Sequence, residues 1–167
     1  MITRELVKHC FIFSSLDDQE LEDIIRITTQ KAFNEGDFIM QEGDGGDSMY
    51  MIMEGEVEVS KSLTMKFGDD DFREIEKVLT RYRPEDHAIF GEMALISQEK
   101  RSASIIARTD CRLLEIKRDD FLKLIEKEHK LGVRVLMKLM EFLVTRLRQS
   151  NQDIIRLTTA LSIALSK

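Results

Sequence analysis

The chain has 167 residues, 43% hydrophobic and 34% charged, with a single proline and a net charge of −6. The length predicts one folded domain with an added extended element, and the composition excludes a disordered chain. The negative net charge argues against direct binding to nucleic acid, because proteins that bind nucleic acid are usually basic. No apolar run approaches the ~18 residues of a membrane helix, and residues 1–8 lack the apolar core of a signal peptide, so we expect a cytoplasmic protein with no membrane partner.

The first predicted helix covers residues 16–28. Ser15 and Asp18 are three residues apart, which is close to a capping-box pattern at a helix start. Leu21 and Ile24 then recur at helical spacing and give the segment one apolar face. This pattern predicts a short amphipathic helix near the N-terminus.

The two cysteines, Cys10 and Cys111, lie far apart in the sequence. They can form a disulfide or remain free buried thiols, and a cytoplasmic location favours free thiols. Two cysteines are too few for a four-thiolate iron–sulfur cluster, and no Cys/His group has the spacing of a zinc site. We therefore expect no metal.

Short strand-like runs separated by turn signals fill the middle of the chain. Strands are predicted at residues 31–33, 38–41, 49–53, 57–66, 72–82, 105–108 and 112–116. The acidic stretch at 68–71 predicts a hairpin turn rather than a metal loop, because no partner ligands recur at calcium-loop spacing. Many short strands with turns between them indicate an antiparallel sandwich or roll.

Helix is predicted again around Phe121 and then from residue 131 to 165. An unbroken heptad seam, apolar at eight of nine positions, runs along the second helix: Leu136, Met140, Leu143, Leu147, Ser150, Ile154, Leu157, Leu161 and Ala164. Such a helix is ~50 Å long at ~1.5 Å per residue, too long for a small β domain to cover. The seam therefore predicts a homodimer through residues 131–165. The alternative is a helix packed wholly on its own domain.

One polar break interrupts this seam, at Ser150, and Asn151 follows it. Polar residues at a coiled-coil core position lower stability and often fix the register of the two helices. They can also face a ligand bound beside the helix. Periodicity leaves both interpretations open.

The segment around Gly91 and Arg101 carries the chemistry. Gly91 permits a close backbone approach, and a helical turn after it presents free N–H groups to an anion. Arg101 offers a fork of donors to a phosphate, and Ser102 adds a hydroxyl and an N–H. Glu92 would repel the anion unless it accepts a hydrogen bond, for which a ribose hydroxyl is suited. The alternative is a Glu92–Arg101 surface ion pair, worth only ~0–1 kcal/mol.

Two segments resemble the phosphate-binding cassette of cyclic-nucleotide-binding domains: Phe90-Gly91-Glu92-Met93-Ala94-Leu95 and Arg101-Ser102-Ala103-Ser104. Upstream, residues 42–52, Gly55 and residues 57–59 resemble the glycine-rich turn and adjoining strands of that family. The resemblance covers about residues 6–151. It implies an α+β fold: an antiparallel, jelly-roll-like β-roll (a double-stranded β-helix) with N-terminal helices and a long C-terminal dimer helix. The expected divisions are an N-terminal helical segment at 1–29, the β-roll at 30–117, and the hinge and coiled-coil helices at 118–167.

The resemblance also implies roles for single residues. The cassette glutamate, Glu92 here, would hold the ribose 2′-hydroxyl, and Arg101 would hold the cyclic phosphate. The binding segment further includes Ala94, with backbone amides completing the phosphate cradle near Gly91, Met93, Ser102 and Ala103. In the catabolite activator the base meets polar residues of the dimer helix, and by register these are Ser150 and Asn151.

The sequence departs from the family at two places. Residues 84–87, with one proline and no glycine, replace a glycine turn before the cassette, so the shape of that loop is open. Catabolite activators continue into a helix-turn-helix domain, and because this chain stops at Lys167 we do not expect DNA binding.

The resulting hypothesis is a non-catalytic sensor of a cyclic nucleotide, cAMP or cGMP with cAMP favoured, which signals to an unknown protein effector by conformational change as a homodimer. The alternative is a dimeric interaction module with the same fold that no longer senses nucleotide. An enzyme such as a phosphodiesterase is disfavoured, because the sequence shows no metal cluster and no paired nucleophile and base.

Overall fold

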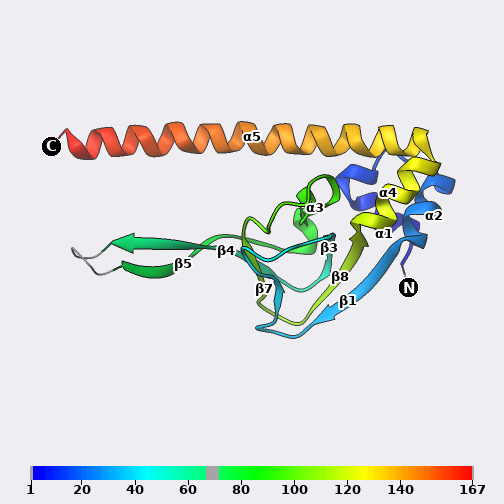
Figure 1. Ribbon diagram of the computed structural model, residues 1–167, viewed down its shortest axis with the longest axis horizontal. Coiled ribbons are helices and arrows are strands. Elements are labelled where there is room, and N and C mark those ends of the chain that lie inside the picture. Colours follow the sequence, from blue (N-terminus) through cyan, green and yellow to red (C-terminus); the bar gives the residue numbers. More distant parts are fainter. Residues whose placement is uncertain (1, 67–71, 167) are drawn as a thin grey trace.

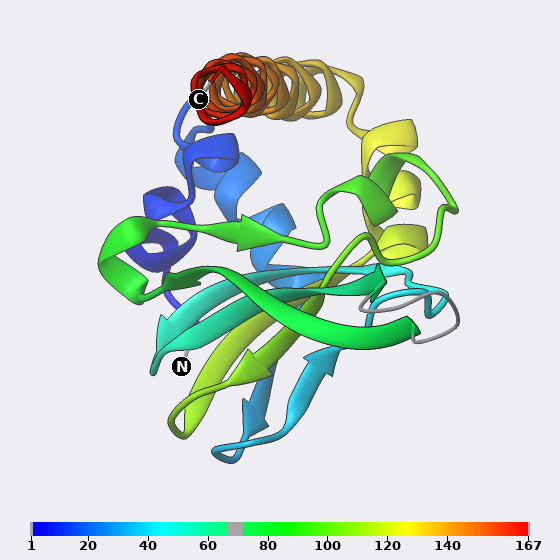
Figure 2. The same cartoon turned by 90° about the vertical axis from the view of Figure 1, so that its left-hand side faces the viewer.

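The structure, a computed structural model, describes residues 2–66 and 72–166, so the hairpin turn predicted at 68–71 lies outside the described residues. A β-roll occupies one side of the molecule, and one long helix, α5, runs across the other (Figure 1). Seen along α5, the shorter helices lie between it and the β-roll (Figure 2). The helical layer therefore joins the long helix to the strands.

The N-terminal helices begin the chain: α1 is Arg4–His9, the 3-10 helix η1 is Phe11–Phe13, and α2 is Asp18–Arg26. The prediction of a helix from 16 to 28 with its start at Ser15 was wrong at both ends. The capping box is formed by Asp17, whose N–H donates to Glu20 Oε2 at 3.0 Å while the Glu20 N–H donates to Asp17 Oδ1 at 2.9 Å. At the other end, Thr28 already begins the first strand.

Two four-stranded antiparallel sheets form the β-roll. The first has the order β1 (Thr28–Phe33), β8 (Cys111–Lys117), β3 (Ser48–Glu54) and β6 (Ile89–Phe90). The second has the order β2 (Phe38–Met40), β7 (Ser104–Ala107), β4 (Val57–Lys66) and β5 (Phe72–Tyr82). The predicted fold class is confirmed, and the predicted strands agree with these bounds to within a few residues, the largest difference being at the start of β1.

In the first sheet β3 is buried on both faces, whereas β1 is mostly exposed. Met49 and Met51 of β3 join the core cluster under the helices, whereas Tyr50 and Ile52 join the cluster inside the β-roll. This alternation follows from the two-residue period of a strand. Cys10 and Cys111 are both free and buried, one in each cluster, so the free-thiol interpretation is confirmed.

Two helices end the chain, α4 (Arg118–Lys127) and α5 (His129–Leu165). The first turns of α5 pack into the helical core through Leu131, Val135 and Leu139. Beyond Leu143 almost every residue of α5 is exposed. Several seam residues are more than half exposed: Met140, Leu147, Ile154, Leu157 and Leu161. The predicted long helix is thus present, with its apolar seam uncovered in the single chain.

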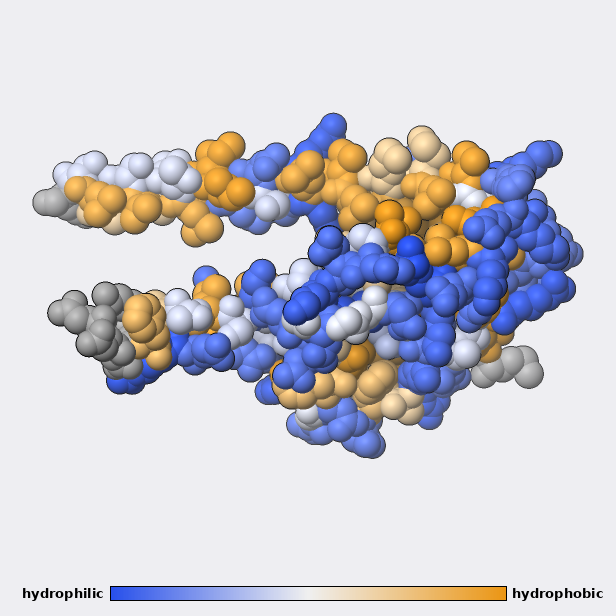
Figure 3. Space-filling model, viewed as in Figure 1, coloured by the Kyte–Doolittle hydropathy of each residue, from blue (hydrophilic) through white to orange (hydrophobic). Residues whose placement is uncertain are grey.

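The β4–β5 hairpin projects from the roll in the same direction as α5 (Figure 1). The space-filling view shows two separate arms, each with apolar residues along it (Figure 3). On the hairpin, the exposed apolar residues are Leu63, Met65, Phe72, Ile75, Val78 and Leu79.

Within residues 2–66 and 72–166, no helix has both the length and the apolar character needed to cross a bilayer.

Candidate functional site

The site begins at the turn between β6 and the short helix α3 (Met93–Ile96). Gly91 occupies this turn with φ of 71°, in the left-handed region that favours glycine. A Cβ on Gly91 would also lie 2.6 Å from the carbonyl oxygen of Ser48 and 2.6 Å from Nη1 of Arg101. The position therefore requires glycine for both its conformation and its close contacts.

Glu92 follows as the N-cap residue of α3 and is only 4% exposed. The turn is closed by two backbone hydrogen bonds, from the Ala94 N–H to the Gly91 carbonyl at 3.0 Å and from the Leu95 N–H to the Glu92 carbonyl at 3.1 Å. The first N–H groups of a helix have no acceptor within that helix, so this turn presents donors to a ligand. The predicted helical turn after Gly91 is confirmed.

The strand before Gly91 is held by aromatic packing. Phe90 stacks on Tyr50 of β3 with ring centroids 5.7 Å apart. The Tyr50 hydroxyl donates to Oε1 of the buried Glu115 at 2.9 Å. Burial, and then this hydrogen bond, raise the pKa of Tyr50 to about 12, so the hydroxyl remains a neutral donor. This packing sets the direction in which the chain enters the Gly91 turn.

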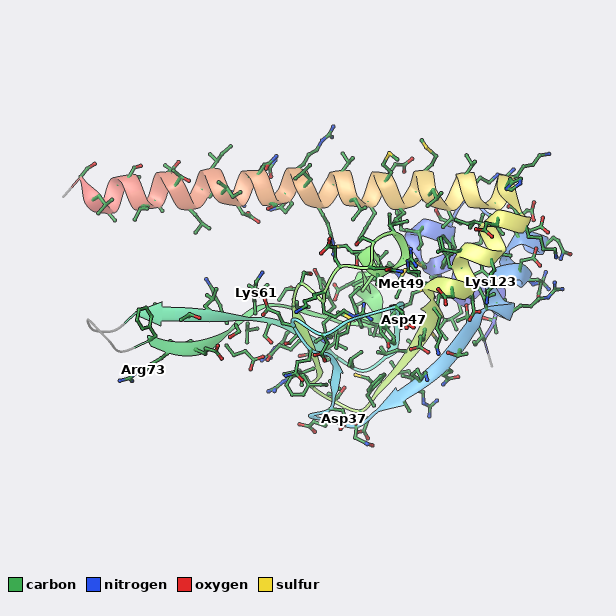
Figure 4. The ribbon with its side chains drawn as sticks, viewed as in Figure 1. Asp37, Asp47, Met49, Lys61, Arg73 and Lys123 are labelled. Carbon is green, nitrogen blue, oxygen red and sulfur yellow. The ribbon has the colours of Figure 1, made fainter. Side chains whose placement is uncertain are left out.

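Arg101 lies on a separate segment that pairs with the glycine-rich turn before β3. The Arg101 N–H donates to the Asp44 carbonyl at 2.8 Å, and the Gly43 N–H donates to the Arg101 carbonyl at 2.9 Å. The Arg101 side chain then crosses Gly46, and its Nη1 donates to the Ser48 carbonyl at 2.8 Å. Asp47 and Met49, the neighbours of Ser48, mark this start of β3 beneath α5 (Figure 4).

These segments border one small pocket. Its lining residues are Met40, Gly91, Glu92, Met93, Ala94, Glu99, Lys100, Arg101 and Ser102. Six of the nine predicted site residues thus meet in one place. Ala103 is half-buried next to this pocket in the sequence but is not among its lining residues. Sequence reasoning did not select Met40, Glu99 or Lys100, which neighbour the predicted segments in space or in sequence.

The ionic partner of Glu92 comes from α5. Arg146 Nη1 lies 2.9 Å from Glu92 Oε1, and Arg146 Nη2 donates to the Ile89 carbonyl at 3.3 Å. The guanidinium also lies over the Phe142 ring, 4.6 Å from its centroid. The alternative interpretation of Glu92 and Arg101 as a surface ion pair is wrong, since Glu92 is buried and pairs with Arg146 while Arg101 bonds Ser48.

Ser150 and Asn151, the predicted base contacts, lie about one turn beyond Arg146 on α5, and both are exposed. Their part in ligand binding stays a prediction, because it involves a partner copy. One sequence feature points toward Arg146: it has no acidic residue at i±3 or i±4, so an ionic partner for it lies elsewhere in the fold. Arg148 has the same property, so this signal alone could not select Arg146.

In the loop before the cassette, a histidine takes the left-handed conformation that the predicted glycine turn would have required. Residues Pro84–Asp86 form a 3-10 turn, and His87 ends it with φ of 49°, in the left-handed region where glycine is usual. His87 stacks on His9 of α1 with ring centroids 5.7 Å apart.

Within the described ranges 2–66 and 72–166, no three His, Cys, Asp or Glu side chains gather as metal ligands.

Fold and pocket together define a β-roll domain in which a carboxylate, a guanidinium and a glycine-led turn converge on one pocket. The family model of the cyclic nucleotide-binding domain matches residues 30–128, more than half of the chain. The chain therefore belongs to the cyclic nucleotide-binding domain family.

Similar proteins agree with this membership. The chain is 31% identical over 115 residues to the cGMP-dependent protein kinase egl-4 of Caenorhabditis briggsae, covering 68% of this chain and 14% of that protein. It is also 31% identical over 115 residues to the cAMP-dependent protein kinase regulatory subunit of Emericella nidulans, covering 68% of this chain and 24% of that protein. The crystal structure of the Thermus thermophilus catabolite activator protein is similar with a TM-score of 0.71 and 27% identity, over 88% of this chain and 62% of that one.

Proposed function

We propose that this chain is a cytoplasmic, non-catalytic sensor that binds a cyclic nucleotide, cAMP in preference to cGMP, and signals as a homodimer to a protein effector. The observation that carries the proposal is the convergence of Glu92 and Arg101 on one pocket, with Gly91 between them. A regulatory subunit named for cAMP and a kinase named for cGMP are both among the relatives, so the family leaves the base open.

In this proposal each pocket residue has a distinct role. Arg101 binds the cyclic phosphate through the guanidinium nitrogens that Ser48 does not occupy, since a guanidinium carries five N–H donors. Glu92 accepts a hydrogen bond from the ribose 2′-hydroxyl. The backbone N–H groups around Met93 and Ala103 complete the phosphate cradle.

The homodimer is supported by the uncovered seam of α5. Leu147 is 61% exposed and Leu157 is 71% exposed, both on the heptad stripe. An exposed apolar stripe of this length is typical of a surface that packs against a partner. In a dimer, Ser150 and Asn151 would be carried toward the nucleotide base by the paired helices, and a change in the angle between α5 and the β-roll would carry the signal.

Calorimetry with cAMP, cGMP and the non-cyclic 5′-AMP tests the proposal. We expect saturable binding of cAMP, weaker binding of cGMP, and none of 5′-AMP; the absence of saturable binding of either cyclic nucleotide below about 1 mM would reject the sensor. Arg101→Ala should weaken binding by about tenfold or more, because a hydrogen bond to a charged group contributes about 1.5–3 kcal/mol. Arg112→Ala, which removes an exposed arginine of β8 paired with Glu54, is the matched control.

The second candidate is a dimeric interaction module that does not sense nucleotide. The specific observation in its favour is that Arg146 already occupies the Glu92 carboxylate. Thermal unfolding separates the two, because a ligand that binds the folded state raises the melting temperature with its concentration. A melting temperature unchanged by cyclic nucleotide, in a dimeric protein, would favour the interaction module.

A further inference from the structure

A second cavity, of about 360 Å³, lies between α1, the first sheet and the 3-10 turn η2 (Pro84–Asp86). It shares no lining residue with the pocket around Gly91 and Arg101, so the proposed nucleotide site makes no use of it. Ligand-binding cavities in proteins commonly measure about 300–1,000 Å³. This cavity is therefore large enough for a small organic molecule.

The floor of the cavity is apolar and comes from three neighbouring strands of the first sheet. Met51 of β3 pairs directly with Leu114 of β8 and with Ile89 of β6. Residues that lie directly opposite on neighbouring strands present their side chains on one face, and all three belong to the buried core under the helices. Met53, two residues beyond Met51, adds a second thioether to the lining.

One wall of the cavity is the end of α1. Leu6, His9 and Cys10 line it and are spaced three and four residues apart, which places them on one side of the helical turn. Leu6 is half-buried and Cys10 is buried, whereas His9 is exposed. The wall therefore changes from apolar to polar toward solvent.

Three of the lining side chains are polar and exposed, and they form the mouth of the cavity: His9, Glu85 and His87. The two imidazole rings stack with an angle of 24° between their planes. Within residues 2–66 and 72–166, none of these three side chains makes a hydrogen bond or an ion pair with another residue. Their polar atoms are therefore free to bind a ligand.

The backbone at His87 is a second observation that points to this place. Its φ of 49° lies in the left-handed region, which costs free energy for a residue other than glycine. Glycine would take this conformation without strain, so the backbone alone does not call for a histidine. Residues held in such conformations are concentrated at functional sites, and here the strained position places an aromatic ring at the cavity mouth.

We propose that this cavity binds a small aromatic molecule that carries an N–H or O–H donor, as a ligand distinct from the cyclic nucleotide. An aromatic ring suits the two methionines of the floor, because thioether sulfur makes favourable contacts with ring edges. The stacked histidines extend the aromatic surface at the mouth. The donor suits the Glu85 carboxylate, which accepts hydrogen bonds and repels an anionic ligand.

Indole is the probe for this site, because the chain contains no tryptophan and indole emission then reports on the ligand alone. We expect a saturable shift of its emission to shorter wavelength, with a Kd of about 0.1–1 mM for so small a ligand. 1-Methylindole, which lacks the N–H, should bind at least about threefold more weakly. The aliphatic alcohol 1-octanol should displace indole only at higher concentration than unlabelled indole does.

Any of three results overturns the proposal. The first is the absence of saturable indole binding below about 10 mM. The second is equal affinity for indole and 1-methylindole, which would mean that no donor is recognised. The third is tighter binding of 1-octanol than of indole, which would mean that the cavity takes an aliphatic occupant.

Methionine methyl signals in NMR spectra test where indole binds. Indole should shift the signals of Met51 and Met53, which line the cavity, and leave that of Met137, 53% exposed on α5, in place. A larger shift at Met137 would mean binding to the exposed apolar helix. A larger shift at Met40 would place indole in the pocket around Gly91. Either result overturns the proposal.

Histidine variants test the mouth of the cavity. His87→Gly removes the ring and keeps a residue that adopts the left-handed conformation readily. We expect it to bind indole about two- to tenfold more weakly, the range for one aromatic contact. His129→Ala is the matched control, because this third histidine is exposed at the start of α5 and does not line the cavity.

Thermal unfolding of both histidine variants shows whether each remains folded, and His9→Ala, an exposed change within α1, serves as a second variant if His87→Gly is unstable. Weaker indole binding by His87→Gly or His9→Ala than by His129→Ala supports the site. Equal binding by all three variants overturns it.

Discussion

Gly46 leaves the space in which the Arg101 side chain lies. A Cβ on Gly46 would overlap the Nε and Cζ atoms of Arg101, whereas a Cβ on the adjacent Gly45 would have no atom within 4 Å. Neither glycine has a positive φ that would itself strain a larger residue. The contact with the side chain, rather than backbone conformation, makes Gly46 necessary.

Gly46→Ala should therefore lower cyclic-nucleotide affinity by about tenfold, because it moves the guanidinium that we propose binds the phosphate away from its bond with Ser48. Calorimetry provides the affinity, and thermal unfolding should show a much smaller change in stability. Gly45→Ala is the matched control and should bind as the wild type does. Equal affinities for the two alanine variants would mean that nucleotide binding does not require the Arg101 side chain to lie against Gly46.

Glu92 gives a prediction that depends on the ligand's sugar. If Glu92 bonds the ribose 2′-hydroxyl, the wild type should bind cAMP at least about tenfold more tightly than 2′-deoxy-cAMP, as expected for a hydrogen bond to a charged group. Glu92→Ala should bind both with similar, weak affinity. The comparison is made by calorimetry on both proteins with both ligands, and a preference for the ribose form that survives in Glu92→Ala would assign the hydroxyl to another residue.

The sequence predicted those features that depend on local periodicity. The heptad spacing along residues 136–164 reports which face of the long helix is apolar, and the alternation at residues 57–60 predicts a strand where β4 lies. The cassette was recognised through its resemblance to a family rather than from local spacing. Its two segments, 90–95 and 101–104, meet through tertiary contacts such as the hydrogen bond from Arg101 to the Ser48 carbonyl.

Features that depend on how elements pack could not be predicted. The pairing of Arg146 with Glu92 depends on the rotation of α5 against the β-roll, which the burial of Leu131 and Val135 determines. Arg146 and Ser150 lie about one turn apart on nearly the same face of α5, so a shift of about 5–6 Å along the helix axis changes which residue meets the pocket. His87 is a second example, since tertiary contacts hold a non-glycine residue in a left-handed conformation.

The α5 seam makes a prediction about association. Leu157→Glu places a charge on the heptad stripe and should convert the proposed homodimer to monomer, because a buried unpaired charge is costly at a coiled-coil core. Ile155 is 66% exposed and Leu157 71%, but only Leu157 lies on the stripe, so Ile155→Glu is a matched control. Light scattering with size-exclusion chromatography measures the mass of each protein. A monomeric wild type, or loss of the dimer in both variants, would show that the heptad stripe does not mediate dimerisation.

The burial of both cysteines predicts that the native protein resists modification by thiol reagents. Burial raises the pKa of the Cys10 thiol to about 12, and burial also raises the pKa of Cys111. Because the thiolate is the reactive form, we expect neither residue to be alkylated at neutral pH in the native protein, and both to react after denaturation. Mass spectrometry after iodoacetamide treatment counts the modified thiols. Rapid labelling of native protein would mean that one of the two core clusters opens.

The raised pKa of Tyr50 predicts how the free energy of unfolding depends on pH in the alkaline range. Its pKa is raised to about 12 in the folded protein, from an ordinary value of about 10, first by burial and then by the Glu115 hydrogen bond. A raised pKa in the folded state means that the neutral hydroxyl is favoured, so this contribution to stability is fully present below pH ~10 and is lost as pH rises from ~10 to ~12.

Tyr50→Phe keeps the ring against Phe90 but has no proton to lose, so its free energy of unfolding should fall less steeply than that of the wild type over this interval. Denaturant unfolding at a series of pH values measures both slopes. Because the other titrating groups are the same in the two proteins, the difference between the slopes belongs to Tyr50. Identical slopes would show that the hydroxyl is solvated in the folded protein, and that Glu115 does not help to hold β3 and β6 beside the Gly91 turn.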